Sequence, residues 1–408
     1  MILDYLKSRE MISFSMPGHK GRGAEFFAID VTELPDTDDL AHPTGMLKNM
    51  LCNLKHYFHS DTCYFLVNGS TCGILAAVYG TLNRGDQVLV DRNAHRSVFN
   101  GLAITGAEGV FIEGEFNEAY GINGAISPRA VEKALFTHPD VKGMILTSPN
   151  YFGICSDVER IAQILHEQGK FLIVDEAHGA HFYFCDQLPV GAMRLGADLS
   201  VCSLHKTMDS PNQTAVLNIK SKLIESDDIL HSINMFQTSS PSYVLMSYGE
   251  RACRNAWQNG QERWGKLIAR CEKLKDQIES LGGYSVLQNS DPTRIVVHTT
   301  RTTGQDLYDF LFHHKIAAEM AYLDNIVLIV TPSNIESDFE LLLHALSEVP
   351  TSVWKNEFLD YCGKISKNTI LSVLPPCNII IREGEKITET ALIRLKQNGI
   401  QFSKLFDN

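Results

Sequence analysis

The chain has 408 residues, of which 44% are hydrophobic and 21% are charged, so it can bury a large core and should form two or more domains. Its net charge of −12 argues against nonspecific nucleic-acid binding, which depends on a basic surface. No run approaches the roughly 18 apolar residues of a membrane span, and the amino terminus does not resemble a secretory signal. The ten cysteines form no Cys-x-x-Cys pair, so we expect no metal site and a reducing, cytoplasmic environment.

Residues 1–45 carry more turn signals than periodicity and are predicted to form an N-terminal arm. From about residue 62 to 220, apolar runs alternate with helical patterns, as in 157–168. The runs are continuous rather than alternating, which indicates strands buried on both faces of a parallel sheet covered by helices. We therefore predict an α/β large domain over 46–245. The predicted strands are Tyr64–Val67, Gln87–Val90, Gly109–Ile112, Gly143–Leu146, Phe171–Val174 and Leu199–Cys202.

The pattern changes after residue 245. A long amphipathic helix is predicted from about Tyr243 to Leu281, followed by strands at Arg294–His298 and Ile326–Val330 with a helix at Gln305–His314 between them. These elements predict a smaller α+β domain over 246–350. Residues 351–408 are predicted to form a C-terminal extension that contains a strand at Ile379–Ile381.

Asp175 and Lys206 each follow an apolar run, Leu172–Val174 and Leu199–Cys202 respectively. Ligands of parallel sheets bind at the carboxyl ends of strands, where both residues are expected to lie. A lysine amine can condense with the aldehyde of pyridoxal 5′-phosphate (PLP), and an acid can keep its pyridine nitrogen protonated. Either residue alone is common at the edge of a parallel sheet. Their order and spacing together favour a PLP site.

A phosphate site is predicted at Asn68–Gly73, which follows the first strand and opens a helix at about Ile74. Backbone N–H groups at a helix start suit a phosphate, and the hydroxyls of Ser70 and Thr71 could add to them. A plain capping turn is the simpler explanation when this segment is considered alone. Beside the predicted PLP lysine we favour the phosphate site, with two further donors, Ser203 and His205.

Three other polar residues are candidates for contact with the cofactor. His95 follows a predicted strand and could stack on the pyridine ring, although a polar loop residue would look the same. His178 lies three residues after Asp175 and could contact a ring substituent, support the acid or simply belong to a turn. Thr238 lies in a hydroxyl-rich turn before the long helix, where a helix cap is the simpler explanation.

Acidic residues are candidates for binding the distal cation of a basic amino acid. Asp30 and Glu33 lie in the acid-rich arm, and Glu319 lies in the predicted smaller domain. Carboxylates pair well with guanidinium and ammonium groups. The alternative is ordinary solvated loop charge, which is the usual role of an acidic run.

Seven motifs match, in order, those of the Orn/Lys/Arg decarboxylase family, which the chain resembles from about residue 13 to 345. These PLP enzymes have the aspartate-aminotransferase fold. The motifs are Pro17–Gly21, Asp30–Pro35, Val67–Thr71, Asn93–Ser97, Thr147–Gly153, Val174–His181 and His205–Thr207.

The resemblance implies a fold type I large domain with a mostly parallel seven-stranded sheet and a smaller α+β C-terminal domain. It implies Lys206 as the lysine that binds PLP, Asp175 on the pyridine nitrogen and His95 on the ring. It places Ser70, Thr71, Ser203 and His205 at the phosphate. Thr238 would reach the phosphate of a neighbouring subunit, which implies a homodimer with shared active sites.

The sequence also departs from the family pattern. Residues 208–213 read Met-Asp-Ser-Pro-Asn-Gln where the family usually has Leu-Pro-Ala-Leu-Thr-Gln, so Asp209 is a new acid close to Lys206. The Pro-Pro-Gly turn of the family's tail is Pro375–Cys377, and Arg382 occupies an apolar strand position. The chain is shorter than most members and lacks their N-terminal receiver-like domain, so we expect no higher assembly through that domain.

The predicted function is decarboxylation of arginine, lysine or ornithine to the corresponding amine, a reaction that serves polyamine biosynthesis among other pathways. Lys206 or His205 could return a proton to the α-carbon. An aminotransferase or a carbon–carbon lyase is the nearest alternative, with Arg382 or Arg294 as the clamp on the substrate carboxylate. A PLP-binding protein without turnover is a further alternative, prompted by the altered loop after Lys206.

Overall fold

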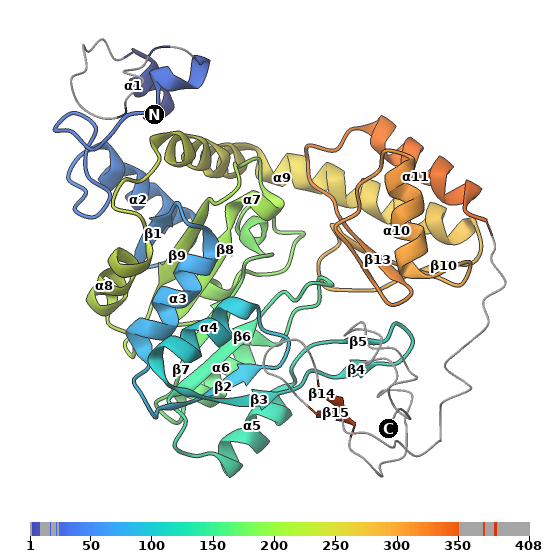
Figure 1. The fold of residues 1–408 in the computed structure, drawn as a ribbon, viewed down its shortest axis with the longest axis horizontal. Helices are drawn as coiled ribbons and strands as arrows, with labels where there is room; N and C mark the ends of the chain where they lie inside the picture. The colour runs from blue at the N-terminus through green and yellow to red at the C-terminus, as the bar shows by residue number, and fades with distance from the viewer. Residues whose placement is uncertain are drawn as a thin grey trace. The chain divides into compact units, whose positions relative to one another are not determined.

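The computed structural model describes residues 2–8, 17, 22 and 24–350, and the backbone of residues 370–371 and 379–381. The chain divides into two compact units, and each is described by itself (Figure 1). The first unit comprises Met1–Glu115 and Ala125–Ile268, and the second comprises Phe116–Gly124 and Ala269–Asn408. Helix α9 (Tyr243–Ser280) contains the point at which the first unit ends, and it matches the long helix predicted from the sequence.

A seven-stranded sheet forms the centre of the first unit, with the strand order β1-β9-β8-β7-β6-β2-β3. Its pairs are parallel from β8 to β3, whereas β9 runs antiparallel to both of its neighbours. The predicted mostly parallel sheet is therefore confirmed. The strands are β1 (Thr62–Leu66), β2 (Gln87–Asp91), β3 (Glu108–Ile112), β6 (Gly143–Thr147), β7 (Phe171–Asp175), β8 (Leu199–Ser203) and β9 (Ala215–Ile219).

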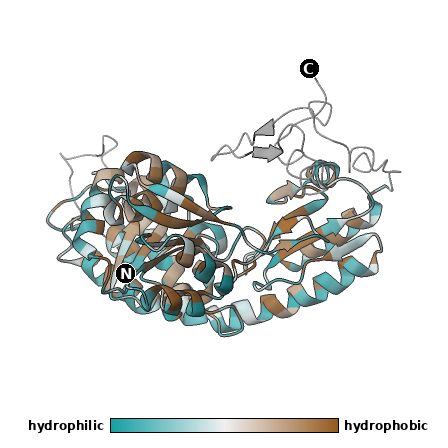
Figure 2. Cartoon of the chain, turned by 90° about the horizontal axis from the view of Figure 1, so that it is seen from below, coloured by the Kyte–Doolittle hydropathy of each residue, from teal (hydrophilic) through white to brown (hydrophobic). Residues whose placement is uncertain are grey.

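The central strands are buried along their whole length. Every residue of β7, β8 and β9 is buried, and Figure 2 shows the strands of this unit mostly in the brown of hydrophobic residues. Helix α3 (Gly69–Thr81) packs directly on the sheet, because a Cβ atom added to Gly73 would lie 2.7 Å from side-chain atoms of Leu66 and Val201. This close approach fixes the amino-terminal end of α3 beside the ends of the strands.

The other helices of the first unit follow the predicted alternation. The predicted helix at 157–168 is α6 (Val158–His166), which buries its apolar face. Its N-cap residue is Asp157, whose side chain accepts a hydrogen bond from the backbone N–H of Arg160. Helix α1 was not predicted, and it buries three apolar side chains within one short segment. The remaining helices are α1 (Ile2–Ser8), α2 (Met46–Tyr57), α4 (Arg96–Thr105), α5 (Pro128–Thr137), α7 (Leu204–Thr207) and α8 (Ser226–Phe236).

The acids of the arm partly serve its own folding. The carboxylate of Asp38 accepts hydrogen bonds from the backbone N–H groups of Thr44, Gly45 and Leu47, and thereby caps the start of α2. The buried hydroxyl of Tyr243 donates to the carbonyl oxygen of Asp38 at 2.6 Å. The arm is thus fastened to the first turn of α9.

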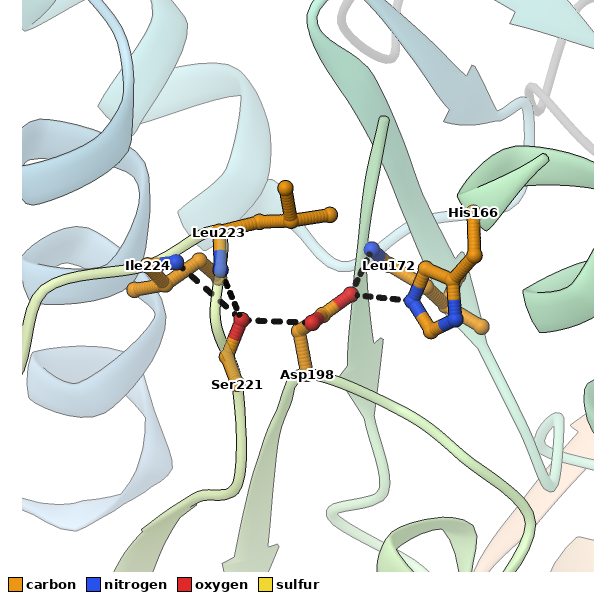
Figure 3. Close-up of polar contacts among 6 residues, drawn as sticks. All are labelled: His166, Leu172, Asp198, Ser221, Leu223 and Ile224. Atoms are coloured by element: carbon orange, nitrogen blue, oxygen red, sulfur yellow. Dashed lines mark hydrogen bonds and ion pairs between the residues drawn. The ribbon is translucent and has the colours of Figure 1, made fainter. Parts of the chain in front are cut away.

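The amino-terminal edge of the large sheet is held by the buried carboxylate of Asp198 (Figure 3). This residue precedes β8, and it accepts hydrogen bonds from the backbone N–H of Leu172 in β7 and from the hydroxyl of Ser221. His166 at the end of α6 lies 2.8 Å from the same carboxylate. The network lies at the opposite ends of β7 and β8 from Asp175 and Ser203.

The second unit contains a four-stranded antiparallel sheet with the order β10-β11-β13-β12. This agrees with the predicted smaller α+β domain. The side chain of Asn325 donates to the carbonyl oxygen of Tyr120 and so binds the turn of the short β4–β5 hairpin. The elements are β4 (Phe116–Asn117), β5 (Ile122–Asn123), β10 (Tyr284–Val286), β11 (Arg294–Thr299), α10 (Gly304–His313), β12 (Met320–Tyr322), β13 (Asn325–Ile329), α11 (Glu336–Glu348), β14 (Ile370–Leu371) and β15 (Ile379–Ile381).

Across the described residues, no helix combines the length and apolarity that crossing a membrane requires.

Candidate active site

Asp175 and Lys206 lie at neighbouring strand ends in the first unit. Asp175 is the last residue of β7 and pairs in register with Val201 of β8, while Lys206 lies in the single turn of α7 that follows β8. The parallel pairing of β7 and β8 therefore brings the predicted acid and the predicted lysine to the same edge. The sequence pattern had placed both residues at the carboxyl ends of strands.

The amine of Lys206 contacts His178. Its Nζ atom lies 2.9 Å from Nε2 of His178, a residue that is only 3% exposed. Because an ammonium group can only donate, Nε2 must be the accepting nitrogen when Lys206 is protonated. The sequence had suggested that His178 supports the acid or the ring, but the structure links it directly to the lysine.

Asp175 is a buried carboxyl group whose pKa is raised, because burial outweighs the opposing effects of its neighbours. Burial raises the pKa of Asp175, whereas the nearby Lys206, the backbone N–H of Ala177 and the His95 side chain lower it in part. The Ala177 N–H donates to Oδ1 at 3.2 Å. A buried carboxylate of this kind suits a cationic N–H partner such as a protonated pyridine nitrogen.

His95 begins helix α4 as its N-cap residue. The backbone N–H of Ser97 donates to Nδ1 of His95 at 3.2 Å, so Nδ1 carries no proton and the neutral ring holds its proton on Nε2. Partial burial lowers the pKa of His95, and the positive charge of Lys206 lowers it further against the opposing effect of Asp175. A neutral imidazole of this kind can stack on an aromatic heterocycle.

A second buried carboxyl group, Asp91, shapes the turn that presents His95. Its Oδ1 atom accepts a hydrogen bond from the backbone N–H of Asn93 at 2.8 Å. Burial raises the pKa of Asp91 to about 6, and the negative charge of Asp175 adds to this effect. The end of β2 thus belongs to the same electrostatic environment as the end of β7.

The predicted phosphate site is a cup at the start of α3. Gly69 has a φ of +73°, and its N–H donates to the carbonyl oxygen of Gln213 at 2.8 Å. Ser203 at the end of β8 donates to the hydroxyl of Ser70 at 2.8 Å, which joins two of the predicted phosphate ligands. The N-cap residue Asn68 makes no side-chain cap to α3, so the first-turn N–H groups can bind an anion.

His205 and Thr238 lie beside this cup. The Nδ1 atom of His205 lies 3.1 Å from the carbonyl oxygen of Thr214, so Nδ1 carries the proton, and burial lowers the pKa of the ring. His205 can donate to a phosphate through Nε2 only when it is protonated, which a nearby phosphate dianion would favour. The backbone N–H of Thr238 donates to Asn68 Oδ1 of the same chain at 3.1 Å.

The predicted substrate residues occupy different parts of the chain. In the first unit, Asp30 is half-buried in the arm, and Glu33 accepts a hydrogen bond from the N–H of Leu40 at 3.1 Å. Burial raises the pKa of Glu33, although the Leu40 N–H lowers it in part. In the second unit, Glu319 is exposed. Arg382 and most of the Pro17–Gly21 motif lie outside the described residues.

Two features of the site were not assigned from the sequence. The ring of Tyr151, in the turn after β6, lies 4.5 Å from the ring of His178. Asp209, the new acid after Lys206, forms an ion pair with Arg263 of α9 at 2.8 Å. Tyr151 belongs to the Thr147–Gly153 motif, which follows the strand next to β7. That position in the sequence could have indicated that Tyr151 lies near the site.

The described residues fit PLP. The cup offers hydroxyls and uncapped N–H groups for a phosphate, and the buried Asp175 can bind a heterocycle N–H. Lys206 supplies an amine after β8, which lies between β1 and β7 in the sheet. This donor set lies within one unit, at one edge of one sheet.

The fold and site define a PLP-type α/β protein, and the chain belongs to the Orn/Lys/Arg decarboxylase family. The family's model, Orn/Lys/Arg decarboxylase, major domain, matches residues 1–378. This confirms the resemblance found in the motifs. It also identifies the family to which the co-linear residues around Asp175 and Lys206 belong.

Similar proteins agree with this assignment. An arginine decarboxylase of Halalkalibacterium halodurans is 31% identical and aligns with 95% of this chain and 90% of its own length. An arginine decarboxylase of Bacillus cereus is 33% identical over 84% of this chain and 79% of its own length. The crystal structure of the Francisella novicida lysine decarboxylase superposes with a TM-score of 0.77 at 17% identity, covering 96% of this chain and 75% of that one. The last comparison confirms the fold.

Proposed function

We propose that this chain decarboxylates a basic amino acid with PLP as its cofactor, and that arginine is the substrate. The placement of Lys206 and Asp175 at adjacent strand ends is the observation that carries the proposal. Family membership supports the reaction class. The names of the two arginine decarboxylases favour arginine over lysine and ornithine.

When bound, PLP supplies an aldehyde that combines with amines and a heterocycle that accepts electrons from a bond broken at the α-carbon. Asp175 would hold the N–H of that heterocycle, because its buried carboxylate requires a cationic partner. The neutral ring of His95 would cover one face. Ser70, Thr71 and Ser203 would bind the phosphate at the start of α3.

Lys206 and His178 form the proton-handling pair of the site. Nζ of Lys206 can donate to Nε2 of His178 across 2.9 Å, so the amine can lose a proton without releasing it to water. The same contact can return the proton to Nζ, from which the α-carbon would receive it. The sequence offered Lys206 and His205 as proton donors to the α-carbon. Lys206 is favoured, because Nδ1 of His205 is hydrogen-bonded to a backbone carbonyl.

The test is to incubate the purified holoprotein separately with arginine, lysine and ornithine, and to measure CO₂, amine and keto acid. We expect CO₂ and amine in equal amounts, fastest with arginine. Keto acid in place of CO₂ would indicate an aminotransferase. Borohydride reduction followed by peptide mapping should place the cofactor on Lys206, and Lys206→Ala provides the control that carries no label.

The non-catalytic alternative is weakened by the surroundings of Asp209. This acid prompted the alternative because it follows the lysine so closely. Its carboxylate forms an ion pair with Arg263, which offsets the negative charge that it would otherwise add near Lys206. A PLP-binding protein without turnover would bind the cofactor yet release no CO₂ from any of the three amino acids.

We also infer a homodimer in which Thr238 serves the neighbouring site. Thr238 is exposed, and its hydroxyl lies 3.2 Å from the hydroxyl of the nearby Ser240. Mixing Lys206→Ala chains with Thr238→Ala chains tests this, because mixed dimers would regain one native site and about a quarter of all sites would be intact. If Thr238 served its own chain, no mixture would contain a native site.

A further inference from the structure

The loop after β6 is built to present Tyr151. The side chain of Asn150 accepts hydrogen bonds from the backbone N–H groups of Phe152 at 3.0 Å and Ile154 at 3.1 Å, and the N–H of Gly153 bonds back to the Asn150 carbonyl. Phe152 is buried by this turn, whereas Tyr151 remains 39% exposed. A large aromatic side chain is therefore held at the surface by a tightly hydrogen-bonded loop.

Tyr151 faces the proton-handling pair. Its ring lies 4.5 Å from the ring of His178 at an interplanar angle of 56°, and Nζ of Lys206 lies 5.8 Å from the centre of the phenol ring. His178 itself is 3% exposed. The phenol ring thus lies against the imidazole and close to the lysine amine that contacts it, while part of the ring meets the solvent.

The contact between Lys206 and His178 depends on the orientation of the imidazole. Nε2 can accept from Nζ only while its lone pair points at the amine, and a rotation about the Cβ–Cγ bond would break the contact. A packed aromatic neighbour restricts that rotation and keeps water from competing for Nε2. The face of the phenol ring also attracts the cationic form of Lys206.

We propose that Tyr151 is a positioning residue that acts through His178. Its ring holds the imidazole in the orientation that pairs Nε2 with Lys206 Nζ and shields that nitrogen from water, and its hydroxyl is not needed for this role. The kinetic consequence depends on the proposed decarboxylase function. The shielding of His178 does not, so the two can be tested separately.

The shielding is tested by diethylpyrocarbonate modification of the full-length protein after PLP has been removed, with peptide mapping at His178. We expect His178 to react several-fold faster in Tyr151→Leu than in the wild type, and at the wild-type rate in Tyr151→Phe, which keeps the ring. Tyr79→Leu is the matched control, because Tyr79 is 37% exposed in the same unit and lies on α3. An unchanged rate at His178 in Tyr151→Leu would overturn the proposal.

The kinetic test uses the same variants as holoenzymes. Tyr151→Leu should lower kcat by about 10- to 100-fold with a smaller change in KM, because a misplaced proton carrier slows the chemical step more than substrate binding. Tyr151→Phe should recover most of the loss, and Tyr151→Met offers a second non-aromatic variant should the leucine variant fold poorly. A phenylalanine variant as slow as the leucine variant would assign the effect to the hydroxyl and reject the positioning role.

The two experiments distinguish a failure of the proposed decarboxylase function from a failure of the proposed Tyr151 role. If the wild type releases no CO₂ from any basic amino acid, the proposed function fails, while the modification rates still decide whether Tyr151 shields His178. If the wild type is active and Tyr151→Leu matches it in kcat, the positioning role fails and the decarboxylase function stands.

Discussion

Asp209 and Arg263 join the loop that follows Lys206, the proposed active-site lysine, to the long helix of the same unit. A terminal nitrogen of Arg263 donates to Asp209 Oδ2 at 2.8 Å, and both side chains are about one-third exposed. The loop continues to Gln213, whose carbonyl binds Gly69 in the phosphate cup. The ion pair therefore stabilises a segment that connects Lys206 to the predicted phosphate site.

Reversing one charge of this pair should weaken PLP binding, and exchanging both should restore it. Asp209→Arg and Arg263→Asp each create a like-charge contact, and we expect a several-fold higher PLP dissociation constant from displacement of the loop. The double exchange, Asp209→Arg with Arg263→Asp, should return the constant toward the wild-type value. PLP titration at low and high salt measures this, and the differences should shrink at high salt because the pair is partly exposed. Additive effects in the double variant would show that the pair does not act as a unit.

Asp175→Asn should retain PLP but lose catalysis. The amide is nearly isosteric, so the site keeps its shape, but it cannot offer a negative charge to the heterocycle N–H. We expect kcat to fall by about 10²- to 10³-fold, in line with the loss of one preorganised electrostatic group. Visible absorbance of the bound cofactor and steady-state decarboxylation measure the two properties. Near-normal kcat would remove Asp175 from its proposed role.

The position of the candidate site could be predicted because its reactive residues lie at the ends of strands. The continuous apolar runs before Asp175 and Lys206 identify buried parallel strands, and the carboxyl ends of neighbouring parallel strands meet at one edge. The start of α3 was placed too late, at Ile74 rather than Gly69. The phosphate-cup residues themselves form the first turn of the helix, and their Gly and hydroxyl side chains look like a loop in the sequence.

Contacts between distant segments could not be predicted from local pattern. The pairing of Asp209 with Arg263 depends on how α9 packs against the loops at the sheet edge. That packing is close, because a Cβ atom on Gly260 would lie 2.5 Å from the carbonyl oxygen of Phe184. The contact of Tyr151 with His178 likewise joins loops after two different strands. Neither periodicity nor a single motif contains that information.

Glu176 should make the stability of the fold depend on pH. Its buried carboxyl group accepts hydrogen bonds from Tyr183, Cys202 and the backbone N–H of Ala192, and burial raises its pKa to about 7. The pKa of Glu176 is higher in the folded state than in the unfolded state. Its contribution to the free energy of unfolding is therefore fully present below about pH 4.5 and is lost as the pH rises through about 7.

Glu176→Gln should remove this dependence. In the wild type, the free energy of unfolding that Glu176 contributes falls by an amount of the order of 3 kcal/mol between about pH 4.5 and 7. The amide of the variant does not titrate, so this fall is absent from it. Thermal unfolding of both proteins from pH 5 to 8 should show the variant gaining relative stability as the pH rises. Asp91 remains in both proteins, so its own titration cancels in the difference. Parallel curves would mean that Glu176 does not titrate in this range.

Asp198 provides the opposite case, a buried acid that supports the fold without taking part in chemistry. It lies at the amino-terminal edge of the sheet, where it accepts hydrogen bonds from Leu172 N–H and Ser221 (Figure 3). Asp198→Ala leaves a buried N–H without its acceptor and should reduce the free energy of unfolding by about 1–3 kcal/mol. Asp198→Asn keeps one accepting oxygen and should lose less.

Measurements of denaturant unfolding and of steady-state kinetics on both variants test this role. We expect KM and kcat to match the wild type at temperatures where the protein is folded, because Asp198 lies at the far ends of β7 and β8 from Asp175 and Lys206. A fall in kcat without loss of stability would place Asp198 in communication with the active site. Comparison with Asp175→Asn then distinguishes the effects of substitutions at the two edges of one sheet. Only the substitution at the carboxyl edge should affect catalysis.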